Sequence, residues 1–196
     1  LMEIYYKKGD ISSAEAYMDK LCNNPKMGFE EKNQLILTLY QEKVDEDLEI
    51  LRNYIKHLES MAKMYPEEGR LWQFLSIGYM RTFRMEEAYQ ACKKAVEYGV
   101  KDLGLYKNYI ITQQFNASDE ERIKTCDDAI KLYPRECIFY IVKGYSLVNL
   151  KEYEKSIETL EKGLKYAKND SDYIDIYSNL AEAYYRIENK IGVNHH

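Results

Sequence analysis

A fixed spacing of 34 residues runs through this chain. Small residues recur at that interval at Ala95, Ala129 and Gly163, each followed by an aliphatic residue. Pro66 and Pro134 lie two such intervals apart. Aromatic residues recur in the same way, at Trp72, Tyr106 and Tyr140. A period of this length is typical of repeat proteins in which each unit is a pair of helices that cannot bury its apolar face alone. The spacing therefore predicts an all-α protein built from stacked helix pairs.

The composition agrees with a helical protein and argues against several classes of partner. With 196 residues and 45% hydrophobic content, the chain can bury a sizeable core. Its three prolines and nine glycines are few for the many tight turns that a β-sandwich requires. The net charge of -5 comes from interleaved charges, so we expect no nucleic-acid partner. The longest apolar stretches, such as residues 138–142, are far too short to span a bilayer. The sequence from Leu1 shows no signal-peptide pattern.

The four cysteines show no C-x-x-C pairing and no partner histidines, so we expect no metal site. Cys92 and Cys126 occupy the same position in neighbouring units, where stacked helices lie about 8–10 Å apart. That separation exceeds the ~5.5 Å usual between the Cα atoms of a disulfide. We therefore expect Cys22, Cys92, Cys126 and Cys137 to be small, buried, apolar residues.

The unit that begins at Gly69 carries a recognisable pattern of residues. It reads Trp72-x-x-Leu75-Ser76-x-x-Tyr79, then Ala88-x-x-x-Cys92, then Ala95. This pattern resembles the tetratricopeptide repeat, and the resemblance implies a right-handed α-solenoid of antiparallel helix pairs. In this register the chain is a single array with a partial repeat at 1–28, a divergent repeat at 29–68, repeats at 69–102, 103–136 and 137–173, and a partial repeat at 174–192.

The divergent repeat is longer than the period, and we place the extension around residues 41–47. Both ends of the chain fall inside the repeat register without a polar capping element, which predicts a section of a longer array of bacterial type. We interpret residues 195–196, two histidines, as the remnant of a tag. The true N-terminus would then lie upstream, and the location stays open between cytoplasm and periplasm.

Proteins of this family hold a peptide or a helix of a partner in a concave groove lined by the first helix of each repeat. The resemblance therefore implies a non-catalytic scaffold for protein–protein interaction. Carried over by register, the groove candidates are Arg70, Gln73, Ile77, Met80, Arg81, Lys107, Ile111, Gln114, Ile138, Ile141, Tyr145, Val148, Glu182 and Tyr185.

One stripe among these candidates is entirely apolar. Its members, three and four residues apart on one helical face, are Ile138, Ile141, Tyr145 and Val148. The opposite stripe of the same helix is assigned to the core, with Tyr140, Gly144 and Leu147. Because soluble proteins rarely leave such a stripe bare, we expect it to be covered by a partner segment, by a second copy of the chain, or by Ile111 and Tyr185 from adjacent units.

The sequence carries no signature of an enzyme or of a bound cofactor. Apart from the terminal pair, the one histidine is His57, which we expect to be a partly exposed helix residue because no catalytic partner can be nominated for it. Adjacent carboxylates such as Glu86 and Glu87 point to different sides of a helix. We expect most tyrosines to be core residues of the repeat, including Tyr79, Tyr106, Tyr109, Tyr140, Tyr177 and Tyr184.

The sequence also bears on three other functions. An RNA-binding helical repeat would need a basic inner surface, which these residues do not provide. A regulatory or sensor module of a larger protein stays open. The subclass of the family that binds acidic chaperone tails uses lysine and asparagine at set positions. Lys107 matches one of them, but Ile77 and Ile111 stand where asparagine is expected and Phe74 replaces another polar residue.

Overall fold

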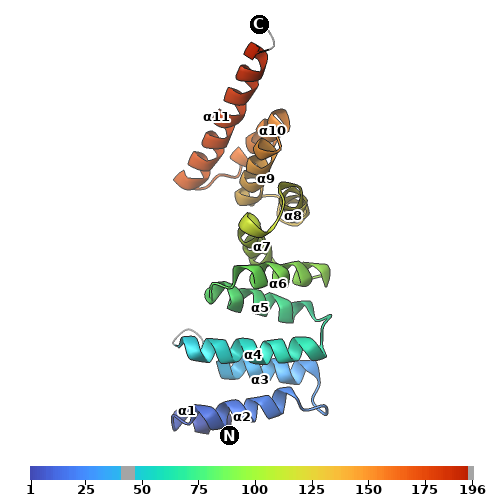
Figure 1. Cartoon of the computed structure of the whole chain (residues 1–196), viewed down its shortest axis with the longest axis vertical. Coiled ribbons are helices and arrows are strands. Elements are labelled where there is room, and N and C mark those ends of the chain that lie inside the picture. Colours follow the sequence, from blue (N-terminus) through green and yellow to red (C-terminus); the bar gives the residue numbers. More distant parts are fainter. Residues whose placement is uncertain (41–46, 194–196) are drawn as a thin grey trace. The chain divides into compact units, whose positions relative to one another are not determined.

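A computed structural model describes residues 1–40 and 47–193 of the chain, and these residues form eleven α-helices and no β-strand (Figure 1). The predicted fold class, an all-α helical-repeat protein, is confirmed. The chain divides into two compact units, Leu1–Val100 and Lys101–His196. The predicted tag remnant at 195–196 and most of the predicted extension at 41–47 lie outside the described residues.

The first unit contains six helices. They are α1 (Met2–Lys7), α2 (Ile11–Cys22), α3 (Phe29–Tyr40), α4 (Leu48–Met64), α5 (Gly69–Arg81) and α6 (Met85–Glu97). Helix α1 packs on α2, α4 contacts α2, α3 and α5, and α5 forms a hairpin with α6 (Figure 1). Small residues of α6, Ala88 and Ala95, are fully buried, as are the larger Leu71 and Leu75 of α5. Helices pack closely where small side chains meet large ones.

The second unit contains five helices. They are α7 (Leu103–Asn116), α8 (Asp119–Leu132), α9 (Cys137–Asn149), α10 (Tyr153–Leu164) and α11 (Asp170–Val193). Helix α9 packs against α8, α10 and α11. Each of the ranges 69–102, 103–136 and 137–173 contains one helix pair, but α11 begins at Asp170, ahead of the boundary placed at 174. The division of the chain into repeats remains our proposal.

Two glycines mark the closest approach of α9 and α10. A Cβ on Gly144 would lie 2.5 Å from Cγ and Cδ2 of Leu160, and a Cβ on Gly163 would lie 2.5 Å from Cβ of Tyr140. The hydroxyl of Ser156 donates a hydrogen bond of 2.8 Å to the carbonyl of Gly144 across the same interface. Each glycine on one helix therefore receives a large side chain of the other, as the repeat pattern predicts.

Pro66 and Pro134 each lie just past the end of a helix. Helix α4 ends at Met64, before Pro66, and α8 ends at Leu132, before Pro134. Proline cannot continue a helix because it lacks an N–H and clashes with the preceding turn. An equivalent hydrogen bond reaches the carbonyl of each proline. The Trp72 indole N–H donates to the Pro66 carbonyl at 2.7 Å. The Tyr140 hydroxyl donates to the Pro134 carbonyl at 2.8 Å.

Helix starts also follow the sequence. Asp10 accepts a hydrogen bond from the Ser13 N–H as the N-cap of α2. Asp119 lies in the first turn of α8, where Ser118 is the N-cap and accepts from the Glu121 N–H. Side-chain oxygens at these positions satisfy backbone N–H groups that have no partner within the helix.

The prediction for the cysteines is confirmed, because all four are buried and free. The prediction for two tyrosines is wrong. Tyr177 and Tyr184 on α11 are 55% and 49% exposed. The corresponding face of α9 is covered by α10, whereas no helix of the described residues covers this face of α11 in the same way.

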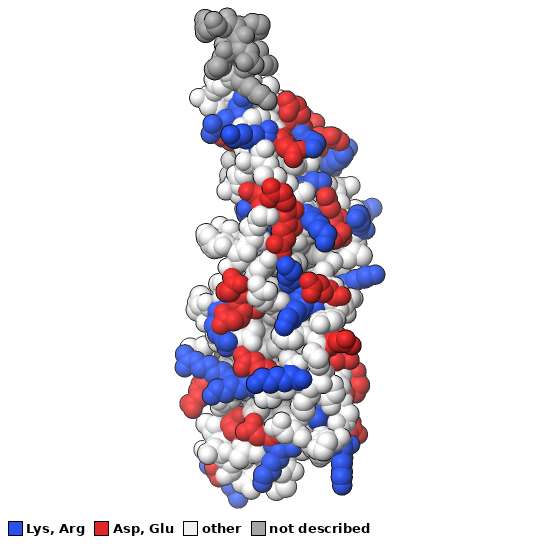
Figure 2. Space-filling model, turned by 45° about the vertical axis from the view of Figure 1, so that its right-hand side comes forward, with Lys and Arg blue, Asp and Glu red and all other residues white. Residues whose placement is uncertain are grey.

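Acidic and basic side chains are interspersed over the face drawn in Figure 2, with uncharged side chains between them. The sequence predicted this arrangement from its interleaved charges. No helix in the described ranges is long and apolar enough to cross a membrane.

Candidate functional site

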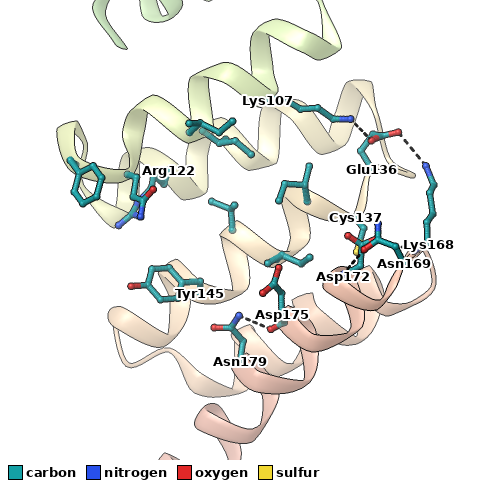
Figure 3. Close-up of a pocket in the computed structure, with 17 residues that line it drawn as sticks. Lys107, Arg122, Glu136, Cys137, Tyr145, Lys168, Asn169, Asp172, Asp175 and Asn179 are labelled. Atoms are coloured by element: carbon teal, nitrogen blue, oxygen red, sulfur yellow. Dashed lines mark hydrogen bonds and ion pairs between the residues drawn. The ribbon is translucent and has the colours of Figure 1, made fainter. Parts of the chain in front are cut away.

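A hollow of about 860 Å³ opens between α7, α9 and α11 in the second unit (Figure 3). Its floor is α9, which contributes Ile138, Ile141 and Tyr145. Helix α9 is apolar on two faces: Tyr140 and Leu147 are buried on one side, and the floor residues lie on the other. A helix that is apolar on both faces needs cover on both. The hollow is the side on which that cover is incomplete.

Three large apolar side chains at this hollow remain open to solvent. Ile111 is 50% exposed, Phe115 is 86% exposed and Tyr145 is 47% exposed. Ile111 and Phe115 are one turn apart on α7, so they present one edge toward the floor. Tyr185, expected to help close the stripe, is itself exposed and does not line the hollow. Within the described residues, Ile111 and Tyr185 therefore leave the stripe only partly covered.

An ion-pair cluster occupies one end of the hollow. The Glu136 carboxylate lies 2.9 Å from the Lys107 ammonium and 3.6 Å from that of Lys168 (Figure 3). The hydrogen bond from Lys107 is the largest influence on Glu136 and holds the pKa of this carboxyl below its usual value. At another edge, Arg122 pairs with Asp119 at 2.6 Å and its guanidinium lies 5.9 Å from the centre of the Tyr145 ring.

The wall formed by α11 is polar and acidic. Asp172 accepts a hydrogen bond of 2.8 Å from the Lys168 N–H, and its own N–H donates to Asn169 Oδ1 at 3.0 Å. Asn179 donates to the backbone carbonyl of Asp175 (Figure 3). The side chain of Asp175 makes no ion pair with any described residue. The hollow thus combines an apolar floor with hydrogen-bonding groups along its rim.

The structure brings together six of the predicted groove residues. Those that line the hollow are Lys107, Ile111, Gln114, Ile138, Ile141 and Tyr145. Val148 on α9 and Glu182 and Tyr185 on α11 do not line it. Glu182 is paired with Arg186 at 2.7 Å.

The remaining predicted residues lie on α5 in the first unit. They are Arg70, Gln73, Ile77, Met80 and Arg81. Arg70 pairs with Glu30, and its guanidinium lies 5.2 Å from the centre of the Phe29 ring. Arg81 lines a separate hollow in that unit. As candidates for a partner-binding groove, these five residues remain proposals.

Sequence reasoning missed several residues that line the hollow. They are Ile110, Phe115, Arg122, Glu136, Cys137, Val142, Lys168, Asn169, Asp172 and Asn179. Phe115 could have been found, because it follows Ile111 by one helical turn. Glu136, Lys168 and Asn169 precede their helices, so helical periodicity gave no signal for them.

The expectation for His57 is wrong: the side chain is buried. Its Nε2 lies 2.6 Å from Glu15 Oε2 and its Nδ1 lies 3.1 Å from Asp19 Oδ1. The two carboxylates are one turn apart on α2 and face α4. Burial of the ring is possible because both nitrogens lie beside acidic oxygens.

Glu15 joins four helices of the first unit. Its carboxylate accepts hydrogen bonds from the hydroxyls of Tyr6 on α1 and Tyr40 on α3, and it contacts His57 on α4. Burial alone would raise the pKa of Glu15, but the hydrogen bonds from His57, Tyr6 and Tyr40 outweigh burial and lower the pKa. This arrangement ties helices together, and we assign it a structural role. The described residues contain no group of three or more His, Cys, Asp or Glu side chains that could hold a metal ion.

Comparison with known proteins places this geometry among helical repeats. The sequence profile of the tetratricopeptide repeat family matches residues 139–170, which cover most of α9 and all of α10. The Hsp70-Hsp90 organizing protein of Triticum aestivum is 32% identical over 89 residues. That match covers 45% of this chain and 15% of the wheat protein, so the chain corresponds to a small part of that relative.

Solved structures share the fold at low sequence identity. A crystal structure of MamA has a TM-score of 0.64 at 18% identity and covers 77% of this chain and 80% of its own. YrrB, described as a protein of this repeat type with an unusual peptide-binding site, has a TM-score of 0.63 at 13% identity and covers 79% and 77%. The TPR2AB domain of yeast Sti1 in complex with Hsp90 has a TM-score of 0.51 at 17% identity and covers 93% and 82%.

Proposed function

We propose that this chain, a tetratricopeptide repeat protein, is a non-catalytic scaffold that holds a segment of another protein in the hollow between α7, α9 and α11. The observation that carries the proposal is the convergence of three exposed side chains, those of Ile111, Phe115 and Tyr145, on one hollow of about 860 Å³. Burying one such side chain contributes about 1.5–3 kcal/mol. A partner segment that covers all three side chains therefore binds with a larger gain in hydrophobic free energy than a segment that leaves them exposed to water.

Similar proteins support this class of function. The solved Sti1 domain is in complex with Hsp90, and YrrB is described by its peptide-binding site. Both resemble this chain in fold, so they support peptide binding without indicating which peptide is bound. The apolar floor and the hydrogen-bonding rim favour a segment with two or more apolar side chains, because the rim can satisfy the polar groups of its backbone.

The binding of acidic chaperone tails is disfavoured by the surroundings of Lys107. Its ammonium is already paired with Glu136 at 2.9 Å, and the neighbouring groove residue is Ile111 rather than a polar residue. An acidic tail would have to displace Glu136, whose charge repels it. RNA is disfavoured for a similar reason, because Asp172 and Asp175 lie on the same wall.

Selection of binders from a displayed library of random peptides, followed by affinity measurement with variants, tests the proposal. The test variant carries Ile111→Ser and Tyr145→Ser, because both side chains are exposed and their loss should leave the fold intact. Ile141 is left unchanged because it packs in a buried cluster with Leu160 and Ile176. Leu132→Ser on α8 is the matched control, since Leu132 is exposed in the same unit but does not line the hollow.

We expect the test variant to bind the selected peptides at least about tenfold more weakly than wild type. The control should bind as wild type does, and all three proteins should have the same thermal midpoint. Equal binding by the test variant, or failure of the wild-type chain to select any peptide, would contradict the proposal.

A further inference from the structure

A second hollow, of about 490 Å³, lies in the first unit between α4 and the turn that joins α5 to α6. Helix α4 contributes Leu48, Arg52 and Lys56, which follow one another at intervals of one turn on a single face. The turn contributes Phe83 and Arg84. All of these residues belong to the same compact unit, and none belongs to the hollow assigned above.

This hollow carries an excess of positive charge. Among the described residues, four cationic side chains line it, those of Arg52, Lys56, Arg81 and Arg84, and one carboxylate, that of Glu59. Arg84 also pairs with Glu87 at 2.9 Å, so the excess rests on Arg52 and Lys56. Glu59 is already engaged, because it accepts a hydrogen bond of 2.8 Å from the Tyr79 hydroxyl and lies 3.5 Å from Arg84. The chain as a whole has a net charge of -5, so this local excess runs against the general composition.

Two of the cations lie on the surface of α4 without an acidic partner among the described residues. Arg52 and Lys56 are exposed and make no ion pair with any described residue. Like charges one turn apart on a helix repel each other, so their pairing on α4 lowers helix stability rather than raising it. An anion placed between them would remove that repulsion, and the fork of an arginine suits a carboxylate or a phosphate.

Phe83 adds an exposed aromatic ring beside these charges. It is 89% exposed and has a φ of 57°, in the left-handed region that non-glycine residues rarely adopt. The turn around it is fixed, because the Thr82 N–H donates to the Gly78 carbonyl and the Arg84 N–H donates to the Tyr79 carbonyl. In the corresponding turn between α9 and α10, Lys151 has a φ of 62°, so a hydrophilic residue adopts the same backbone conformation there. The backbone geometry of this turn therefore does not require an aromatic residue at this position.

We propose that this hollow is a second binding site, which takes an anionic segment of a protein. Carboxylate or phosphate groups of the segment pair with Arg52 and Lys56, and a neighbouring apolar side chain packs on Phe83 and Leu48. This second site shares no residue with the hollow between α7, α9 and α11. The two hollows also differ in the charge of the residues that line them. A chain with both sites can hold an apolar segment on one unit and an acidic segment on the other.

The probe is a synthetic peptide of glutamates with one central phenylalanine, and its binding is measured by fluorescence anisotropy at low and at physiological ionic strength. A second peptide with phosphoserines in place of glutamates distinguishes the two sources of anionic groups, and a third with lysines in place of glutamates is the negative control. Arg52→Glu with Lys56→Glu is the test variant. Lys20→Glu with Lys26→Glu is the matched control, because it makes the same change in net charge at exposed lysines outside the hollow.

We expect the test variant to lose about tenfold or more in affinity for the anionic peptides, with the control close to wild type. Phe83→Gly should weaken binding of the phenylalanine-containing peptide while its thermal midpoint stays level or rises, since glycine adopts a positive φ without strain. Ile111→Ser with Tyr145→Ser should leave this binding unchanged. Equal losses in the test and control variants, equal binding of the lysine peptide, or no binding tighter than about 1 mM at low ionic strength would overturn the assignment.

Discussion

Replacing Gly144 by alanine adds one methyl group where α9 and α10 leave no room for it. Replacing glycine by alanine at an uncrowded interior position of a helix stabilises a protein by about 1 kcal/mol. Here the new Cβ would lie 2.5 Å from Leu160 Cγ, an atom close to the backbone of a fully buried side chain. Overpacking of this kind costs about 1–3 kcal/mol and can cost more. We therefore expect a net loss of up to about 2 kcal/mol instead of a gain, measured by urea denaturation followed by circular dichroism.

Gly104→Ala on α7 is the matched control in the same unit. Gly104 is exposed in the first turn of α7, and its Cβ would approach only Asp102 Oδ1, at 3.1 Å, the oxygen that caps this helix by accepting from the Leu105 N–H. This variant should be neutral or more stable by up to about 1 kcal/mol. A gain in stability for Gly144→Ala similar to that of the control would refute the close approach.

A double-mutant cycle checks the pairing of the two helices. Leu160→Ala alone should cost about 2–5 kcal/mol, because Leu160 is fully buried. In the combination of Gly144→Ala with Leu160→Ala, the new methyl group occupies space that the leucine has vacated. The combined loss should therefore fall short of the sum of the single losses by at least about 1 kcal/mol. Additive losses would mean that the two residues do not face each other.

Three further predictions concern the rest of the chain. Ala95→Leu and Ala129→Leu should each lower the free energy of unfolding by about 1–3 kcal/mol, because both alanines are fully buried between helices; unchanged melting would put the register in error. Burial raises the pKa of the Cys126 thiol to about 12, so at about pH 8 iodoacetamide should alkylate it far more slowly in the native protein than in urea. The lowered pKa of Glu15 means that its carboxylate stabilises the first unit above the unfolded glutamate value of about 4.3, and that this contribution is lost as the pH falls through the lower folded value. Urea denaturation at a series of acidic pH values should show a weaker acid dependence for Glu15→Gln than for wild type.

The helix pairs could be predicted from the sequence because the 34-residue period indicates which positions carry small side chains and which carry large ones. Gly144 and Gly163 had to receive large side chains, and Leu160 and Tyr140 fill those places. The prolines likewise fixed the ends of α4 and α8. Both inferences rest on local rules, which act within one helix pair.

The environment of His57 could not be predicted, because its partners are remote in sequence. Glu15 lies 42 residues away from His57, and Tyr40 lies 25 residues away from Glu15. The helices concerned belong to the part of the chain that departs most from the period. The hydrogen bonds around Glu15 depend on how α1, α2, α3 and α4 meet, and periodicity says nothing about that.

The candidate site was predictable only where a residue lies on the helix face that the repeat register assigns to the groove, since Arg122 and Asn179 lie within helices and were missed. Register sets the direction of a helical side chain, so Ile111, Ile138 and Tyr145 were placed in one hollow. Glu136 and Lys168 lie in the connections that precede α9 and α11, where register does not apply. Tyr177 and Tyr184 show a further limit, since a core position is buried only when a second helix covers it.

Site-specific photo-crosslinking tests the central claim most directly. A photoreactive amino acid is placed at Phe115 or Tyr145 in the hollow, and at Leu132 outside it, and each protein is irradiated in extract of cells that make the protein. We expect Phe115 and Tyr145 to crosslink to one and the same partner and Leu132 not to crosslink to it, and we expect Ile111→Ser to abolish or sharply reduce the crosslink. Crosslinks that are equally strong at Leu132, or that survive loss of Ile111 unchanged, would contradict the account.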